Sequence, residues 1–274
     1  MFMTRLCSSV VLVVLSLVTI LTGGYLLAGV LLFLALTAFR ELTKACKLAK
    51  EGGEISALEV IGYLGILAYY LLMVFAADEM ILFLCLITIL VAFMFLYVFT
   101  FPKYHAEQIM CAFFCVAYAP VMLSFIYLVR LLPYGIYSVW MIFISSWICD
   151  TCAYVFGMLF GKHKLAPVLS PKKSIEGALG GIFGSALVGA LYAYFVVEPA
   201  ISEQRVTWIF VLISAVGAVI SQVGDLAASA IKRNHDIKDY GKLIPGHGGV
   251  MDRFDSVIFT APMIYFLARL LIHG

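Results

Sequence analysis

The stretch from Leu6 to Phe39, LCSSVVLVVLSLVTILTGGYLLAGVLLFLALTAF, contains no charged residue. A helix crosses the roughly 30 Å hydrocarbon core of a bilayer with about 20 apolar residues. This stretch is too long for one crossing, and the Gly23-Gly24 pair marks a turn inside it. It therefore predicts two consecutive membrane-spanning helices, at about residues 6–22 and 25–40.

The same apolar character extends over the whole chain of 274 residues, of which 64% are hydrophobic and 12% are charged. Its mean hydropathy is +1.07. A soluble globular domain usually carries about 25% charged residues, so this chain could not cover its own surface in water. The composition excludes a soluble enzyme, a disordered chain and a nucleic-acid-binding domain.

Further apolar runs predict spans at about 58–77, 80–101, 109–132, 136–160, 177–197, 206–231 and 254–272. The first run follows Arg5 as a signal peptide would, but no small-residue cleavage pattern follows it, so we interpret it as a helix. The predicted fold is an all-α polytopic membrane protein with about nine transmembrane helices. We divide it into N-terminal transmembrane helices at 1–135 and a C-terminal transmembrane region at 136–274.

The distribution of positive charge predicts the orientation. With the N-terminus in the cytoplasm, all of the 18 Lys and Arg residues fall on the cytoplasmic side except Arg130, Arg205 and Arg269. Positive residues mark the cytoplasmic side of membrane proteins. Two connections on that side, at 161–176 and 232–253, are long, polar and rich in Gly and charge, and we expect the chemistry there.

Two carboxylates lie inside apolar runs, Asp150 and Asp225. An acid at the centre of a membrane helix costs about 2.5–3.5 kcal/mol on insertion scales, so we expect both to face a polar interior and to have a function. The structural alternative is an acid that pairs with Lys or Arg only to hold helices together. Glu59 and Glu107 lie at the ends of spans, where a solvated carboxylate is expected.

The second cytoplasmic loop and its flanks, residues 229–256, read SAIKRNHDIKDYGKLIPGHGGVMDRFDS. Such mixed charge suits polyphosphate chemistry, because Lys and Arg neutralise phosphate oxygens and carboxylates hold Mg²⁺. Gly248 and Gly249 would let the backbone approach an anion closely. Asp252 and Asp255, three residues apart at a helix start, can share one face. A loop that only anchors the positive side would explain the basic residues but not the interleaved acids.

The first cytoplasmic loop carries Lys172 and Lys173 directly before a helix that is predicted to begin near Ile175. Ser174 is placed to cap that helix, and a capped helix start with two lysines is an anion site. Glycines at spacings of three and four predict close helix packing behind it, at residues 177, 180, 181 and 184.

The seven cysteines are odd in number and lack the spacing of a disulfide framework. Most lie in apolar runs, where cysteine packs as a small hydrophobic residue. Cys149 and Cys152 enclose Asp150 in a C-x-x-C pattern, but no second pair accompanies them, so we expect no metal or redox site there.

The run from Ser229 to Asp255 resembles the signature of phosphatidate cytidylyltransferases, also called CDP-diacylglycerol synthases. The resemblance is strong over about residues 145–260, and the N-terminal spans resemble the family only in hydropathy and layout. One departure is Ser174, where many relatives have a threonine, which keeps the hydroxyl. The matching positions are Ser229, Lys232, Arg233, Lys238, Asp239, Gly241, Pro245, His247, Gly248, Gly249, Asp252, Arg253 and Asp255, together with Asp150, Thr151, Ala153, Tyr154, the run 170–174, Glu176, Gly177, Gln222, Gly224 and Asp225.

The resemblance implies that CTP reacts with phosphatidic acid to give CDP-diacylglycerol and pyrophosphate, with Mg²⁺ required. Both substrates are anions, so metal ions and basic side chains must offset their repulsion, and positioning supplies most of the rest. We expect Asp225, Asp252 and Asp255 as metal ligands, and Asp225, Asp252, Lys173, Lys232 and Arg233 as catalytic residues. The expected substrate-binding residues are Asp150, Lys172, Ser174, Lys238, Asp239, His247, Gly248, Gly249 and Arg253.

The expected partners are CTP, phosphatidic acid and the lipid bilayer, without nucleic acid. A homodimer and a second, monovalent cation are left open. The expected location is a bacterial inner membrane, with the active site facing the cytoplasm.

Two alternative functions stay open beside this hypothesis. One is a transporter that uses Asp150 and Asp225 as proton or cation relays. The other is a different CTP-dependent lipid enzyme, such as a polyprenol kinase or an archaeal-lipid cytidylyltransferase.

Overall fold

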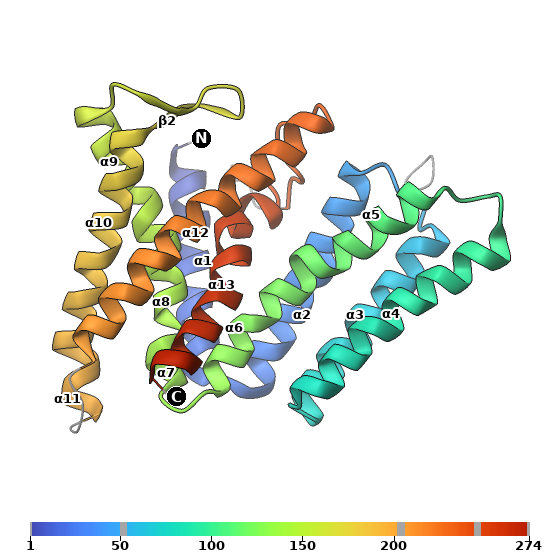
Figure 1. The fold of residues 1–274 in the computed structure, drawn as a ribbon, viewed down its shortest axis with the longest axis horizontal. Coiled ribbons are helices and arrows are strands. Elements are labelled where there is room, and N and C mark those ends of the chain that lie inside the picture. Colours follow the sequence, from blue (N-terminus) through green and yellow to red (C-terminus); the bar gives the residue numbers. More distant parts are fainter. Residues whose placement is uncertain (1, 50–53, 202–205, 244–247, 273–274) are drawn as a thin grey trace. The chain divides into compact units, whose positions relative to one another are not determined.

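The computed structural model describes residues 2–49, 54–201, 206–243 and 248–272, with side chains described from residue 11 onward apart from residue 12. Helices make up most of this part of the chain (Figure 1). Within the described ranges, eight helices are long and apolar enough to cross a membrane, and Val13–Thr22 forms a shorter apolar helix. The protein is an integral membrane protein, and the predicted all-α polytopic fold is confirmed.

Six of the predicted spans are single helices whose ends lie within a few residues of the predicted ones. The hydropathy pattern locates them well, because a backbone in lipid must satisfy its own hydrogen bonds and a single apolar segment does so by forming a helix. They are α1 (Phe2–Thr22), α2 (Gly24–Ala45), α3 (Ala57–Phe75), α4 (Glu79–Thr100), α12 (Thr207–Asn234) and α13 (Met251–Ile272).

The other three spans each contain a wider, π-helical turn. In η1 (Ala117–Val121) this turn holds Pro120, which has no N–H to donate and would crowd a regular helix. The first of these spans is built from α5 (Ala106–Val116), η1 and α6 (Met122–Leu131). The second consists of α7 (Gly135–Ser138), α8 (Trp140–Phe143), η2 (Ile144–Ile148) and α9 (Cys149–Phe160), and the third of α10 (Ile175–Tyr192), η3 (Ala193–Val197) and α11 (Glu198–Ile201).

The first polar loop contains a small antiparallel hairpin, which the sequence analysis did not predict. Strand β1 (Lys164–Ala166) pairs with β2 (Ser170–Ser174), so that Lys164 lies opposite Ser174 and Ala166 opposite Ser170. Strand β2 continues directly into α10, and this junction brings two lysines to the start of that helix.

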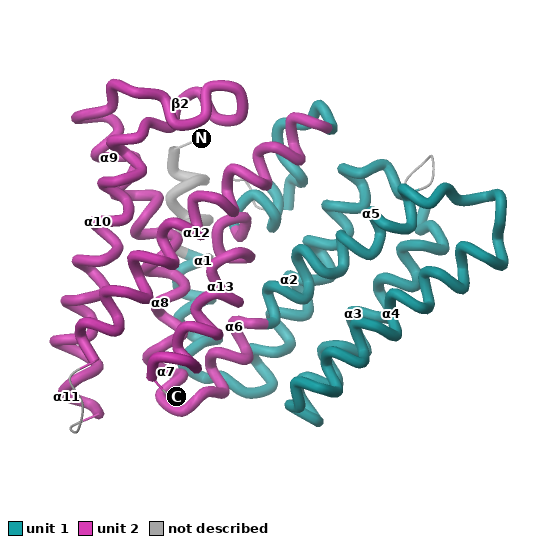
Figure 2. The backbone as a smooth tube through the Cα atoms, viewed as in Figure 1, with its two compact units in different colours: residues 1–124, 235–253 teal, residues 125–234, 254–274 magenta. Residues whose placement is uncertain are grey.

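The structure forms two compact units that are interleaved in the sequence (Figure 2). Unit 1 contains residues 1–124 and 235–253, and unit 2 contains residues 125–234 and 254–274. The division expected from the sequence is instead a single one, between residues 135 and 136. In the structure, the second polar loop belongs to unit 1 and the hairpin belongs to unit 2.

In unit 1, α3 packs between α2 and α4 (Figure 1). Glu59 at the start of α3 is buried, and the expectation of a solvated carboxylate there is wrong. Its Oε1 accepts a hydrogen bond from Thr43 Oγ1 at 2.9 Å, and its Oε2 accepts one from the Ser56 backbone N–H at 2.9 Å. The reciprocal bond from the Glu59 N–H to Ser56 Oγ completes a capping box. Glu107 is exposed, as expected.

In unit 2, α10 packs closely against α9, and the predicted glycine face is the reason. A side chain at Gly180 would collide with Phe156, and one at Gly184 would collide with Cys152. At Gly181 a Cβ would lie 2.9 Å from the Cys149 carbonyl oxygen, closer than real Cβ contacts. The prediction of close helix packing at these glycines is therefore confirmed.

Candidate active site

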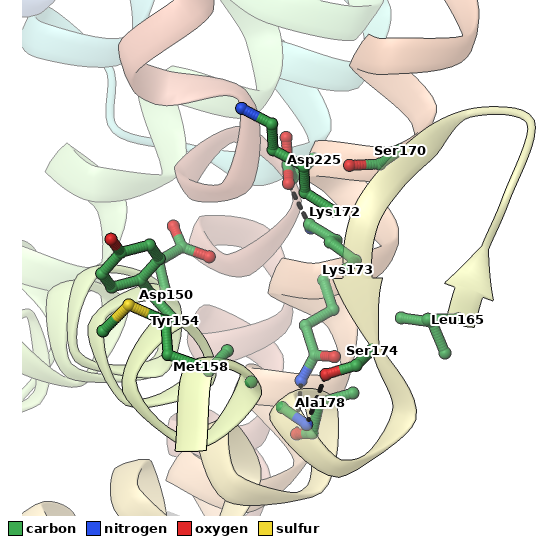
Figure 3. Close-up of a pocket in the computed structure, with 14 residues that line it drawn as sticks. Asp150, Tyr154, Met158, Leu165, Ser170, Lys172, Lys173, Ser174, Ala178 and Asp225 are labelled. Carbon is green, nitrogen blue, oxygen red and sulfur yellow. Dashed lines mark hydrogen bonds and ion pairs between the residues drawn. The ribbon is translucent and has the colours of Figure 1, made fainter. Parts of the chain in front are cut away.

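Unit 2 contains a cavity of about 520 Å³ between α9, the hairpin, α10 and α12 (Figure 3). One wall comes from α9, and the opposite one comes from β2 and the start of α10. The polar side chains on these walls are of the kinds that bind phosphates and cations. The cavity is lined by Asp150, Ala153, Tyr154, Gly157, Met158, Leu165, Ser170, Lys172, Lys173, Ser174, Gly177, Ala178, Gln222 and Asp225.

An ion pair joins Lys173 of β2 to Asp225 of α12 inside this cavity (Figure 3). The Lys173 Nζ contacts Asp225 Oδ2 directly, and each side chain is only 26% exposed. An unpaired charge in the membrane region is costly, and each of these residues supplies the counter-ion of the other. Asp225 is expected to face a polar interior, and Lys173 is part of that interior.

The junction between β2 and α10 is built as the sequence predicts. Ser174 is the N-cap of α10, and its Oγ accepts a hydrogen bond from the Gly177 backbone N–H at 3.1 Å. Lys172 and Lys173 precede this cap and line the cavity. The first N–H groups of a helix and its dipole favour negative charge, so the lysines and the helix start attract the same ligand.

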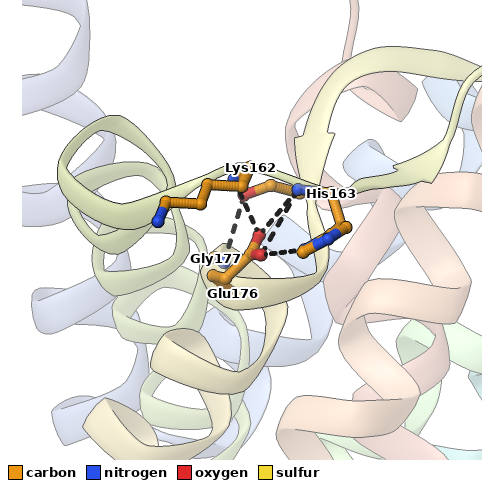
Figure 4. A network of polar contacts seen from close by, with 5 residues as sticks. Lys162, His163, Glu176 and Gly177 are labelled. Atoms are coloured by element: carbon orange, nitrogen blue, oxygen red, sulfur yellow. Dashed lines mark hydrogen bonds and ion pairs between the residues drawn. The ribbon is translucent and has the colours of Figure 1, made fainter.

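Glu176, in the first turn of α10, fixes the entry of the hairpin (Figure 4). Its Oε2 accepts hydrogen bonds from the backbone N–H groups of Lys162 at 3.1 Å and His163 at 3.2 Å. The His163 Nδ1 lies 2.6 Å from its Oε1, and the His163 carbonyl accepts a bond from the Ile175 N–H at 2.9 Å. These contacts hold the chain just before β1 against the start of α10.

Gln222 ties α12 to α10 next to the cavity. Its Nε2 donates to the Ala178 carbonyl oxygen at 3.1 Å and to the Cys149 sulfur at 3.5 Å. Gln222 lies three residues before Asp225, so the two side chains share one face of α12. In the sequence Gln222 is only part of a motif, and the structure gives it a positioning contact.

Asp255 of α13 adds a third carboxylate to this region of unit 2. Helices α12 and α13 cross closely at Gly224, where an added Cβ would lie 2.9 Å from the Asp255 carbonyl oxygen. The Asp255 carboxyl group is subject to the electrostatic effects of Asp225, Lys232 and Asp150. Carboxylate oxygens that face one another's charge are the ligands that a hard divalent cation such as Mg²⁺ prefers.

Unit 1 contains the second polar loop, and Asp252 organises it. The buried Asp252 Oδ2 accepts hydrogen bonds from the Tyr240 N–H at 2.8 Å and the Gly249 N–H at 3.0 Å. Gly248 adopts a left-handed backbone with φ of 88°, and a side chain there would press against the Asp252 carboxylate. The anion that Gly248 accommodates in this structure is therefore the carboxylate of Asp252 itself.

Glu41 of α2 is a site residue that the sequence analysis missed. Its Oε1 accepts a hydrogen bond from the Val250 N–H at 3.0 Å and its Oε2 one from the Met251 N–H at 2.8 Å, at the first residue of α13. The side chain is buried, and Gly241 and Gly249 leave the room that its carboxylate occupies. One signal was available, because Glu41 shares a helix face with Ala38 and Ala45 and so points into the protein.

The cavity brings together five of the predicted site residues, Asp150, Lys172, Lys173, Ser174 and Asp225. Lys232 and Arg233 follow on the last turn of α12, half-buried and exposed respectively. Unit 1 holds Lys238, Asp239, Gly248, Gly249, Asp252 and Arg253, and His247 lies outside the described residues. The roles assigned to all these residues stay predictions.

A polytopic membrane fold with lysines, carboxylates and a capped helix start around one cavity defines a membrane protein equipped for phosphate-bearing ligands. Residues 3–271 match the profile of the Cytidylyltransferase family, and the chain belongs to that family.

Three relatives illustrate the likeness. A Staphylococcus haemolyticus protein named phosphatidate cytidylyltransferase is 32% identical over 266 residues, which cover 96% of this chain and 97% of the relative. A protein of the same name from Staphylococcus epidermidis is 33% identical over 265 residues, with the same coverage of 96% and 97%. A third, from Staphylococcus saprophyticus, is 38% identical over 156 residues, and this match spans 57% of the chain and 58% of the relative.

Proposed function

We propose that this protein is a phosphatidate cytidylyltransferase that makes CDP-diacylglycerol for phospholipid biosynthesis. A phosphate oxygen of phosphatidic acid attacks the α-phosphorus of CTP. A new phosphoanhydride bond forms there, and the bond to the β-phosphate breaks, so that pyrophosphate leaves. The membership in the Cytidylyltransferase family and the full-length likeness to proteins of that name support this assignment.

The observation that carries the proposal is the composition of the cavity in unit 2. It combines Lys172, Lys173 and the N-terminus of α10, which attract phosphates, with Asp150 and Asp225, which attract cations. A site that must hold two anionic reactants together needs both kinds of group. The lipid phosphate is already a nucleophile, so the proposed chemistry requires no strong general base.

The carboxylates fit a required Mg²⁺. Asp225 and Asp255 would hold the ion, with Asp150 nearby in unit 2. The resemblance to the family also implies Asp252 of the second polar loop as a ligand. When bound, Mg²⁺ would neutralise negative charge on the phosphate oxygens of the nucleotide. Asp252 already accepts backbone hydrogen bonds through Oδ2, so in this proposal it also keeps the loop before α13 in place.

The basic residues have complementary roles in the proposal. Lys173 balances the charge of Asp225 in the ion pair, and the adjacent Lys172 is exposed toward an incoming triphosphate. Lys232 and Arg233 at the end of α12 supply further positive charge for CTP and the lipid phosphate. The resemblance to the family implies a substrate-binding role for Lys238 and Arg253 as well. Arginine and lysine offer the donors that phosphate oxygens accept.

We place the site at the cytoplasmic face of a bacterial inner membrane. CTP is soluble and phosphatidic acid stays in the bilayer, so the reaction needs a site at a membrane–water boundary. The excess of Lys and Arg in the two long polar loops predicts the cytoplasmic side. The staphylococcal relatives support a bacterial membrane.

The test is product formation by purified protein in detergent micelles with CTP, phosphatidic acid and Mg²⁺, followed by mass spectrometry. We expect a CDP-linked lipid and an equal amount of pyrophosphate, both abolished by a chelator of divalent cations. Turnover in micelles would also exclude a transporter. If polyprenol or an archaeal-type lipid is converted and phosphatidic acid is not, the proposed substrate is wrong.

The metal assignment has its own test. We expect the Asp225→Asn and Asp252→Asn variants to lose Mg²⁺-dependent turnover, because an amide is a poor substitute for a carboxylate ligand. Near-normal turnover in both variants would refute the assigned ligands. Asp236→Asn is the matched control, because this exposed acid lies in the same loop and has no assigned role.

A further inference from the structure

Three cysteines of unit 1 lie together at a place that the proposed reaction does not use. Cys46 directly follows the last residue of α2, and Cys111 and Cys115 lie one turn apart on α5. Their sulfur atoms all lie within 4.8 Å of one another. Cys115 is fully buried and the other two are half-buried, so the cluster lies just beneath the protein surface.

The backbone holds these side chains in place from two separate elements. The Cys46 N–H donates to the Leu42 carbonyl at 2.8 Å, and the chain then reverses at Lys47, which has a left-handed φ of 56°. A further bond from the Leu48 N–H to the Thr43 carbonyl at 2.9 Å closes this helix end. On α5, the spacing of four residues puts Cys111 and Cys115 on one face.

The spacing of the sulfur atoms is close to that of a metal site. Zinc binds thiolate sulfur at about 2.3 Å in a tetrahedral arrangement, which separates two ligand sulfurs by roughly 3.8 Å. Small side-chain rotations would bring sulfur atoms 4.8 Å apart or less to that separation. Isolated buried cysteines act as small hydrophobic residues, but three neighbouring sulfurs, one at the end of α2 and two on α5, offer a set of soft ligands.

We propose that Cys46, Cys111 and Cys115 form a binding site for one thiophilic metal ion of the Zn²⁺ class. Each thiol loses its proton to the solvent when the ion binds, so the site contributes three thiolate ligands, and water takes the fourth position. The site is distinct from the expected Mg²⁺ site, whose ligands are carboxylates. Soft thiolates select such ions, whereas Mg²⁺ prefers oxygen.

The proposed ion would join the end of α2 to α5. Glu41, which accepts the hydrogen bonds of Val250 and Met251, lies near the same end of α2. A cross-link at Cys46 would thus stiffen the helix end that anchors the start of α13. We expect bound Zn²⁺ to raise the unfolding temperature of the protein, since an ion that binds only the folded state stabilises it.

The experiment uses the full chain, reduced and purified in detergent, then loaded with Zn²⁺ or Co²⁺ and freed of excess ion. Elemental analysis should give one tightly bound Zn²⁺ per chain. Co²⁺ should produce the near-ultraviolet absorption of a cobalt–thiolate bond. The Cys111→Ser/Cys115→Ser variant should lose both signals, and Cys85→Ser, which alters a buried cysteine of α4 outside the cluster, should keep both.

A second measurement on the unaltered chain covers the case in which the double variant does not fold. Bound Zn²⁺ should slow alkylation of Cys46, Cys111 and Cys115 at least tenfold, while Cys152 is alkylated at an unchanged rate, as mapped by mass spectrometry of peptides. The proposal is overturned if the reduced protein binds no Zn²⁺, if Zn²⁺ protects other cysteines instead, or if the folded double variant retains the ion.

Discussion

Lys173 of strand β2 and Asp225 of helix α12 form an ion pair that connects the hairpin to α12 inside the cavity of unit 2. Both side chains are largely shielded from water, so each charge depends on the other for its stability. In the proposed reaction, the same two groups serve as a phosphate-binding cation and a metal-binding anion. The charges of these two groups therefore balance each other before either substrate binds.

The first prediction concerns Lys173. We expect Lys173→Met to lower kcat for CDP-lipid formation by about 10²–10³-fold, the usual effect of removing one preorganised electrostatic contact to the reacting group. The rate should be measured with labelled CTP at saturating Mg²⁺. Lys162→Met is the control, because this exposed lysine lies outside the cavity and only its backbone N–H is used. A kcat for Lys173→Met equal to that of the control would show that the lysine has no part in the reaction.

The second prediction separates two contacts at the hairpin. Glu176 accepts backbone hydrogen bonds from Lys162 and His163, whereas the His163 ring is 75% exposed and forms a surface contact with Glu176. Exposed ion pairs contribute little, so His163→Ala should leave activity nearly unchanged. Glu176→Ala releases the hairpin entry and should raise KM for CTP, because Lys172 and Lys173 lose their fixed position.

Steady-state kinetics with varied CTP checks this order. If His163→Ala raises KM as much as Glu176→Ala does, the ring contact and not the pair of backbone bonds positions the hairpin. If neither variant changes KM, the hairpin does not need to be fixed for CTP to bind.

The third prediction concerns the contact between α9 and α10. A Cβ at Gly180 would overlap the Phe156 side chain near its attachment to the backbone. Gly180→Ala should therefore push the two helices apart and lower the free energy of unfolding by about 1–3 kcal/mol, the usual cost of overpacking. Activity should fall as well, since α9 carries Asp150 and α10 begins at the cavity.

Gly29→Ala is the matched control, because a Cβ at this position on α2 meets no atom within 4 Å. Thermal unfolding of both variants in the same detergent gives the comparison. Equal unfolding temperatures for the two variants would mean that α9 and α10 can relax without cost, contrary to the packing argument.

Most of the fold follows from local sequence. The positions of the spans follow from hydropathy. The starts of α3 and α10 are encoded within one turn, by Ser56 with Glu59 and by Ser174 with Gly177. Ser174 was predicted as a cap because its partner is only three residues away. The hairpin was not predicted, because strands as short as β1 leave no alternating pattern to detect.

The features of the structure that the sequence did not reveal depend on distant partners. Glu41 accepts hydrogen bonds from residues more than 200 positions later, so no local sequence pattern indicates its role. Cys46 lies far from Cys111 and Cys115 in the sequence, and only folding brings their sulfur atoms together. Glu59 was misjudged for the same reason, because the hydroxyl that satisfies its buried carboxylate comes from Thr43 on another helix.

The last prediction concerns Glu41, whose carboxylate holds the first N–H groups of α13. Glu41→Ala leaves two buried N–H groups without an acceptor, and each such group costs about 1–3 kcal/mol. Glu41→Gln keeps the size and one acceptor oxygen, but it removes the negative charge that the helix start favours. Both the unfolding temperature and the rate of CDP-lipid formation should therefore fall in the order wild type, Glu41→Gln, Glu41→Ala.

The control is Lys44→Ala, a change at an exposed position on the same helix, which should match the wild type in both measurements. If the Glu41→Ala variant unfolds at the wild-type temperature, then other groups must hold the start of α13.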